Sequence, residues 1–550
     1  MTLRVRASAF FAVSIVLAAF LYASFFANFW STLSDWSGFG FTWTHQMFHN
    51  YLSGRPYQSS LFATLDAGHS VGFSFNPYAF LHADAIHVNF TPYAFARLWA
   101  LRPTPGMIYA LIFAWNLAAG AWLSRSILRR AALKDGPERL RFAWGVLAVG
   151  GLLSVLCQMA QMLLFAGPFL LGAYDAWLSR RRGVFALWAM ALTLVSEDAA
   201  MTTACFGACL FLFEDEGRPY GLIAAGVSVP YLLFLLLVVQ PAARAELTLT
   251  GSTTTAVVAG KLLSLSARGV AENLRSMLPL APFIPALALA AGLFGVPDRR
   301  GLIRAAGLAV FPALPHWGEC VVVGGAHHLL PPWYGLFLGL LSWLRDAKRP
   351  APAAALWAPL AAGVFVLISL RVQAGHLPLR LKPALYRLAG KADKAAALER
   401  SLTVEEASNR AVIAAAASIP ADRSLVFLAN NRVSGFITGR SEIWDFPAFY
   451  GRADCLLIQK DAIDANYRFV PKAGVPLEDV LAATPRSGER NQEVSLEMAA
   501  ALRAALAKTH AVAREDEHIL LFERRERVVF VNPPSTYGWG WTRAITKKDG

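Results

Sequence analysis

Long apolar runs separated by short polar connectors fill the first two-thirds of the chain. A helix needs about 20 mostly apolar residues to cross the hydrocarbon core of a bilayer, and many of the runs approach that length. They lie at residues 8–30, 106–124, 142–157, 160–178, 183–197, 199–213, 220–240, 278–296, 302–323, 329–345 and 353–371. The pattern predicts a polytopic α-helical membrane protein with about 11 transmembrane helices.

Beyond residue 371 the pattern becomes that of a soluble domain. Helical spacing of apolar and charged residues occurs at 395–417, 477–483 and 494–507. Short runs typical of strands occur at 425–428, 455–458, 518–522 and 528–531. We therefore expect a transmembrane domain over residues 1–371 and a soluble α/β domain over residues 372–550.

Basic residues recur in every second connector of the membrane domain, at 125–141, 179–183, 214–219, 297–304 and 345–352. By the positive-inside rule these connectors face the cytoplasm together with the N-terminus. The loop 31–105 and the C-terminal domain then face the opposite side, which is the periplasm if the chain lies in the inner membrane of a Gram-negative cell. Topology thus accounts for much of the net charge of +14, and binding to nucleic acid is not expected.

The start of the chain resembles a signal peptide, because Arg4 and Arg6 precede an apolar core. The apolar run continues to Trp30, which favours an uncleaved first span. Five cysteines show no metal-ligand spacing, and no phosphate-binding loop, dinucleotide fingerprint or HExxH sequence is present. Any chemistry must therefore come from dispersed residues that converge at the outer face.

The loop 31–105 carries most of the candidate site residues. Asp35 follows the first span closely, and a partly desolvated carboxylate there is suited to act as a general base, although the surrounding residues also have turn composition. His82, Asp84 and His87 could converge on a phosphate or a divalent ion, or form the hydrogen-bonded core of a loop.

Two further polar clusters interrupt the apolar runs. Glu197 and Asp198 form an acidic pair, and carboxylates at membrane depth usually face a cavity. A chain reversal at Ser196 would instead place them at the outer surface. His327 and His328, preceded by Glu319, fall at the outer end of the ninth run, where an interfacial anchor is the alternative. The charge pattern assigns all three clusters to one membrane face.

Several short motifs resemble an uncharacterised bacterial membrane family, domain of unknown function 2079. They are Gln46, residues 52–56, 59–61, 89–92, 98–101, 103–105 and 197–199, and in the tail 419–420, 430–431, 439–440, 446–447 and 453–454. The chain departs from the family where two acidic residues fall on Gly40 and His45, where Asn89 replaces a histidine, where residues 158–161 replace an Asp-Phe-His element, and where Ser196 replaces a lysine.

That family is similar to the GT-C glycosyltransferases, polytopic enzymes that use polyprenyl-phosphate sugars and carry an acidic catalytic residue on a long first outer loop. The resemblance implies a GT-C-like fold and an inverting transfer of a hexose or pentose from a polyprenyl-phosphate carrier to a glycan, lipid or protein acceptor. Asp35 or Asp84 would activate the acceptor hydroxyl. The substrate-binding candidates are His45, Gln46, Arg55, His82, His87, Asn89, Glu197, Asp198, His327 and His328.

No cofactor is required by this scheme, and a divalent cation, Mg²⁺ or Mn²⁺, is optional because the donor is a monophosphate. The alternative is a non-enzymatic protein with the same fold, either a translocator of lipid-linked glycans or a binding scaffold. A translocator needs polar residues along a continuous path through its spans, and the chain has few charges in the middle of its runs. The sequence therefore favours the enzyme.

Overall fold

The computed structural model describes residues 3–32, 39–53, 90–131, 133–156, 162–239, 266–275, 277–322, 329–348, 354–372, 381–420, 423, 425–427, 440, 443–445, 453–459, 503–504 and 506–526. Most of these residues are helical, and a small sheet follows near the C-terminus.

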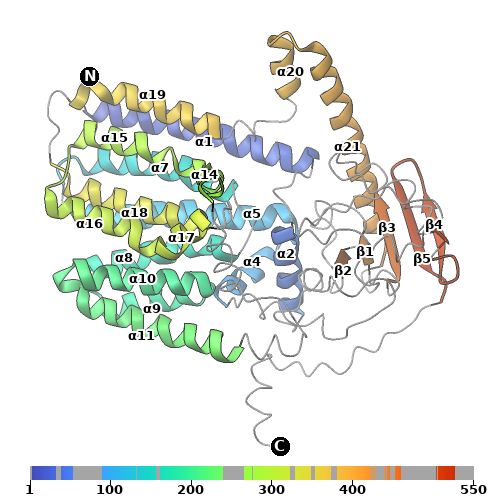
Figure 1. Ribbon diagram of the computed structural model, residues 1–550, viewed down its shortest axis with the longest axis horizontal. Coiled ribbons are helices and arrows are strands. Elements are labelled where there is room, and N and C mark those ends of the chain that lie inside the picture. Colours follow the sequence, from blue (N-terminus) through green and yellow to red (C-terminus); the bar gives the residue numbers. More distant parts are fainter. Residues whose placement is uncertain are drawn as a thin grey trace, which may run out of the picture.

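Long helices lying side by side form the body of the protein (Figure 1). They are α1 (Leu3–Thr32), α5 (Pro105–Ala114), α6 (Gly120–Arg129), α7 (Gly136–Leu156), α8 (Ala166–Leu178), α9 (Arg182–Thr193), α10 (Glu197–Phe213), α11 (Arg218–Phe234), α15 (Phe283–Phe294), α16 (Arg299–Val310), α17 (Leu314–Val322), α18 (Leu330–Asp346) and α19 (Ala354–Val372). Among the shorter helices, α2 (Phe39–Leu52) and α4 (Ala96–Trp99) lie at one end of this bundle, and α14 (Ala267–Arg275) packs on α17.

Three helices in the described residues are long and apolar enough to cross a membrane: Leu3–Phe26, Gly106–Arg129 and Arg218–Val238. A fourth is added if the bent pair Ala267–Arg275 and Leu278–Phe294 forms one span. At a rise of about 1.5 Å per residue, α9 and α10 measure about 18 and 26 Å, less than the hydrocarbon thickness of about 30 Å. The count of about 11 spans therefore stays a prediction.

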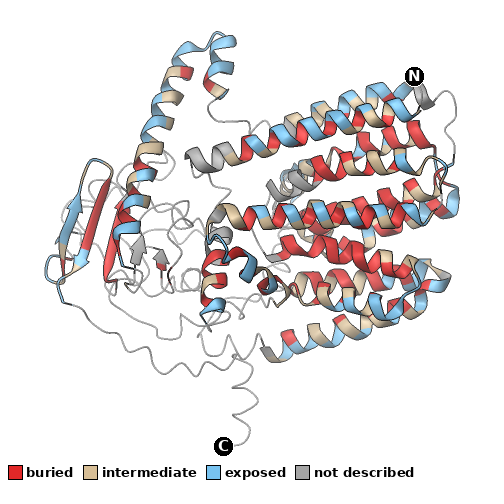
Figure 2. Ribbon diagram, turned by 180° about the vertical axis from the view of Figure 1, so that it is seen from behind, coloured by how far each residue is buried: buried red, intermediate tan, exposed pale blue. Residues whose placement is uncertain are grey.

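The surface of the bundle is itself apolar. Large side chains on outward faces are more than half exposed, among them Leu222, Leu237, Ile284, Trp357 and Leu367. Buried residues face the interior of the bundle, and exposed ones alternate with them on the outer helices (Figure 2). Because an apolar surface of this extent is unfavourable in water, the helices indicate association with a membrane.

One end of the bundle is held together by ion pairs between the basic connectors. Arg304 of α16 pairs with Glu214 after α10, and its Nη1 lies 2.9 Å from Oδ2 of Asp346 at the end of α18. Arg180 pairs with Glu216 at 2.7 Å, joining the connectors that precede α9 and α11. The connectors predicted to be cytoplasmic therefore do gather at a single end, which is also where α1 begins (Figure 1).

Helices α16 and α18 approach closely because glycine lies at their contact. A Cβ atom on Gly335 would be 2.6 Å from the carbonyl oxygen of Ala309, and one on Gly339 would be 2.7 Å from that of Ala305. Gly335 and Gly339 are four residues apart on one face of α18, the small-xxx-small spacing that lets membrane helices pack backbone to backbone.

Gly339→Ala should therefore destabilise the protein, by about 1–3 kcal/mol, because the added methyl group overpacks a contact that backbone atoms cannot relieve. The matched control is Gly363→Ala on α19, where a Cβ meets nothing within 4 Å. Thermal unfolding in detergent should show a lower midpoint for the Gly339 variant and an unchanged one for the control. Equal midpoints for the two variants would show that this contact does not set stability.

The C-terminal part is a five-stranded mixed sheet with the strand order β2-β1-β3-β5-β4. The strands are β1 (Leu425–Phe427), β2 (Ile443–Asp445), β3 (Cys455–Gln459), β4 (His510–Glu515) and β5 (Ile519–Arg524). β1 is parallel to β2 and β3, whereas β5 is antiparallel to β3 and β4. Helix α21 (Ala392–Ser418) packs against β3, and α20 (Leu381–Leu388) precedes it. Three of the four strands expected in the tail are thus present, and the fourth, at 528–531, lies outside the described residues.

The imidazole of His510 joins β4 to the residues before β3. It is 2% exposed, with Nε2 2.9 Å from the carbonyl oxygen of Ala453 and Nδ1 2.8 Å from Oγ1 of Thr509. Since a carbonyl oxygen only accepts, Nε2 donates to Ala453, and Nδ1 of the neutral ring accepts from the Thr509 hydroxyl. Burial lowers the pKa of His510 from its usual value of 6.5.

The sheet should accordingly lose stability on acidification. Below about pH 6.5 the unfolded chain binds a proton at His510 that the folded chain does not, so the free energy of unfolding falls as the pH drops towards the lowered pKa. Hydrogen exchange of the full chain, corrected for intrinsic rates, should show weaker protection of β3 and β5 at pH 5 than at pH 7. His510→Gln should flatten this dependence, and an equal slope in both proteins would contradict the assignment.

Candidate functional site

Helix α2 carries two of the predicted substrate-binding residues, and both are buried. His45 is 2% exposed and Gln46 is fully buried. The His45 ring meets the ring of Trp99 edge-on with centroids 4.6 Å apart, and the imidazole hydrogen-bonds the backbone of Pro103. Burial, reinforced by the charge of His49, lowers the pKa of His45 to about 3. A neutral, enclosed imidazole packs α2 onto α4 and the start of α5, and its role towards a substrate stays a prediction.

Phe90 and Thr91, which follow the outer loop, are hydrogen-bonded to the turn between α9 and α10. The backbone N–H groups of Phe90 and Thr91 both donate to the carbonyl oxygen of Leu194, at 2.9 and 3.0 Å. The Thr91 hydroxyl donates to the carbonyl oxygen of Ala191 at 2.8 Å. Two segments about 100 residues apart in the sequence therefore meet at this turn.

The acidic pair begins helix α10 directly after that turn. Ser196 has extended backbone angles and caps the helix, its Oγ accepting from the N–H of Ala199 at 3.2 Å. Glu197 and Asp198 occupy the first helical turn and are half-buried. Carboxylates at this position are stabilised by the helix dipole, so the pair has a structural purpose whether or not it also serves a site.

A histidine on α17 connects this acidic turn to a second element. His316 is fully buried, with Nδ1 3.2 Å from Oε2 of Glu319 and Nε2 3.3 Å from Oγ1 of Thr202. The imidazole also hydrogen-bonds the backbone of Asp198, and the Thr202 hydroxyl donates to the Asp198 carbonyl oxygen at 3.1 Å. We call Asp198, Thr202, His316 and Glu319 the α10–α17 cluster.

The chemistry of this cluster is that of proton acceptance and hydrogen bonding. A carboxylate beside an imidazole fixes its tautomer and favours its protonated form, which is how a buried histidine is prepared to take a proton. Glu319 retains 17% exposure of its side chain, so it reaches the edge of the bundle while His316 does not. No group of three metal-ligating side chains converges in the described part of the chain.

An aromatic contact joins α11 to the residues that are hydrogen-bonded to the α9–α10 turn. The ring of Tyr231 lies 6.4 Å from that of Phe90, in an edge-on arrangement. The residues after the loop, the α9–α10 turn, α11 and the α10–α17 cluster therefore form one neighbourhood. It lies at the end of the bundle that also carries α2, opposite the ion-paired connectors (Figure 1).

Sequence reasoning missed His316 and recognised Glu319 only as a residue before the histidine pair. Their spacing of three residues on an apolar helix was the available signal, since it places an imidazole and a carboxylate on one helix face. Eight predicted site residues lie outside the described residues: Asp35, Arg55, His82, Asp84, His87, Asn89, His327 and His328.

An apolar groove of about 610 Å³ opens far from this cluster, between α1, α15 and α19. Phe10, Leu289, Leu293 and Leu367 are among the side chains that line it, and Arg6 lies at its rim. Its lining suits a hydrocarbon chain. None of its lining residues belongs to the acidic turn of α10.

No protein-family model matches the chain, and no curated protein matches it either.

Proposed function

We propose that the chain is an integral glycosyltransferase of GT-C type in a bacterial inner membrane, with about 11 spans, a cytoplasmic N-terminus and a periplasmic C-terminal domain. It transfers a sugar from a polyprenyl-phosphate carrier to an acceptor at the periplasmic face. One observation carries the proposal: the acidic turn of α10, His316 and Glu319 of α17 and the residues after the outer loop meet at the bundle end opposite the arginine-rich connectors.

In the proposed reaction acidic residues act on the acceptor, and basic residues bind the phosphate of the donor. The acceptor oxygen attacks the anomeric carbon, the bond from that carbon to the phosphate oxygen breaks, and polyprenyl phosphate leaves with the electron pair. A base, for which Asp35 and Asp84 are the candidates, takes the hydroxyl proton. Arg55, His82 and His87 are suited to hold the phosphate through charge-assisted hydrogen bonds.

The α10–α17 cluster has a different part in this scheme. Carboxylates repel a phosphate, so Glu197 and Asp198 are suited to the sugar and acceptor hydroxyl groups, to which they offer hydrogen-bond acceptors. Thr202 and His316 both hydrogen-bond the backbone of Asp198 and so hold the first turn of α10 against α17. Glu319 pairs with His316 and holds its imidazole against the backbone of Asp198.

A non-enzymatic translocator or scaffold remains the competing function, and two observations favour it. The capped start of α10 explains the acidic pair without a substrate, and His45 serves packing. The enzyme and the scaffold differ in whether polyprenyl phosphate is released.

The test uses the full chain in phospholipid vesicles with a panel of polyprenyl-phosphate hexoses and pentoses and a mixture of glycan and lipid acceptors. We expect release of polyprenyl phosphate by the wild type and a loss of about 10²–10⁴-fold in Asp35→Asn or Asp84→Asn, whichever is the base. Asp198→Asn and Glu319→Gln should each lower the rate at a temperature where the variant is still fully folded, since each also removes a carboxylate that stabilises the start of α10 or the buried imidazole.

The matched control is Glu216→Gln, which removes an exposed carboxylate at the opposite end of the bundle. It should leave the rate unaltered. Absence of release from every donor by the wild type would overturn the enzyme in favour of the scaffold. Release by the wild type with full activity in all four of the other variants would overturn the assignment of the site.

A further inference from the structure

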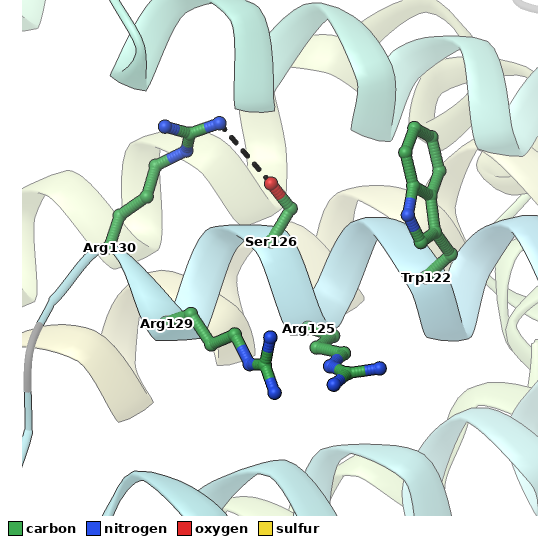
Figure 3. A pocket seen from close by; sticks show the side chains of 5 residues that line it. All are labelled: Trp122, Arg125, Ser126, Arg129 and Arg130. Atoms are coloured by element: carbon green, nitrogen blue, oxygen red, sulfur yellow. Dashed lines mark hydrogen bonds between the residues drawn. The ribbon is translucent and has the colours of Figure 1, made fainter.

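Helix α6 carries a basic pocket at the ion-paired end of the bundle. Leu123, Ile127 and Leu128 are buried on one face of this helix. The pocket, of about 450 Å³, is lined by Trp122, Arg125, Ser126, Arg129 and Arg130 (Figure 3). It belongs to no part of the site proposed above.

The three arginines of the pocket differ in their partners. Nε of Arg130 lies 3.0 Å from Oδ1 of Asp175, and Nη2 lies 3.3 Å from Oγ of Ser126. Arg125 and Arg129 have no carboxylate within ion-pair distance among the residues that the structure describes. They are four residues apart and point to the same side of α6 (Figure 3). Two neighbouring positive charges on one side of a helix favour an anion between them.

The position of the pocket indicates where that anion comes from. α6 is the last part of Gly106–Arg129, a helix long and apolar enough to cross a membrane, so the pocket lies at the end of such a helix. Trp122 is 63% exposed and, seven residues before Arg129, lies about 10 Å deeper along the helix. Tryptophan prefers the interface between headgroups and acyl chains, and arginine forms bidentate hydrogen bonds with phosphate.

We infer that this pocket binds the headgroup phosphate of an anionic phospholipid from the leaflet that faces the basic connectors. Arg125 and Arg129 contact the phosphate, and Trp122 packs along the upper part of the acyl chains. A neutral, zwitterionic lipid satisfies the pocket less well, because its own ammonium group is repelled by the arginines.

Native mass spectrometry of the full chain in detergent tests the inference, with phosphatidylglycerol and phosphatidylcholine titrated separately. The wild type should bind its first phosphatidylglycerol at least about tenfold more tightly than phosphatidylcholine. Arg125→Gln with Arg129→Gln should remove this preference, since each basic residue near an anionic surface contributes roughly a factor of five. Arg125→Lys with Arg129→Lys should keep part of it, because the charge stays but the guanidinium fork is lost.

The matched control is Arg299→Gln with Arg300→Gln, which removes two exposed arginines at the same end, outside the pocket. It should retain the preference. Equal losses in the two double variants would show general surface charge and overturn the site, as would a wild type without any preference. Displacement of the lipid by glycerol 3-phosphate at the same concentration would make the occupant a small soluble phosphate and overturn the assignment to a lipid.

Discussion

Charge is costly inside hydrocarbon, and this constraint sorts the charged side chains of the bundle to its two ends. At one end Arg304, Glu214 and Asp346 tie α16, α10 and α18 together. Arg139 is 3% exposed there and donates to the carbonyl oxygens of Leu344 and Ala347. At the other end imidazoles and carboxylates take the place of arginine.

The acidic end owes its geometry to close helix packing. α16 and α18 meet through glycine, and α17 continues from α16, so their contact determines where His316 faces α10. On the other side of α10, a Cβ on Gly221 of α11 would be 2.6 Å from the carbonyl oxygen of Gly207. Helix α10 is therefore held on both sides, and its first turn presents Glu197 and Asp198 at a fixed place. The hydrogen bonds from Phe90 and Thr91 to Leu194 then anchor the residues after the loop at the same point.

The sequence predicted what depends on periodicity and charge. Apolar runs predicted the helices, and the arginines of the connectors predicted which helix ends lie together, because both follow from local composition. The chain reversal at Ser196 is present, since a serine followed by two acids favours a helix start. The tail strands at residues 425, 455 and 519 were placed by their apolar pattern.

Contacts between residues far apart in the sequence could not be predicted in the same way. His45 looked available on a polar loop, yet Trp99, which encloses it, is 54 positions away in the sequence. His316 lies in an apolar run, and only the packing of α17 on α10 gives it Thr202 as a partner. The number of spans depends on whether each helix is long enough for the thickness of the bilayer. Helices of 12 to 17 residues are too short to decide this by length alone. The residues proposed for catalysis, Asp35 and Asp84, lie outside the described residues.

The central claim is that the two ends of the bundle lie on opposite faces of the membrane. Cysteine labelling in spheroplasts tests it directly, using a variant without native cysteines that carries either Arg181→Cys, in the connector before α9, or Glu517→Cys, in the turn between β4 and β5. The account predicts that a membrane-impermeant maleimide labels the Glu517 variant in intact spheroplasts and the Arg181 variant only after the membrane is opened. Labelling of both positions from the outside, or of Arg181 alone, would contradict it.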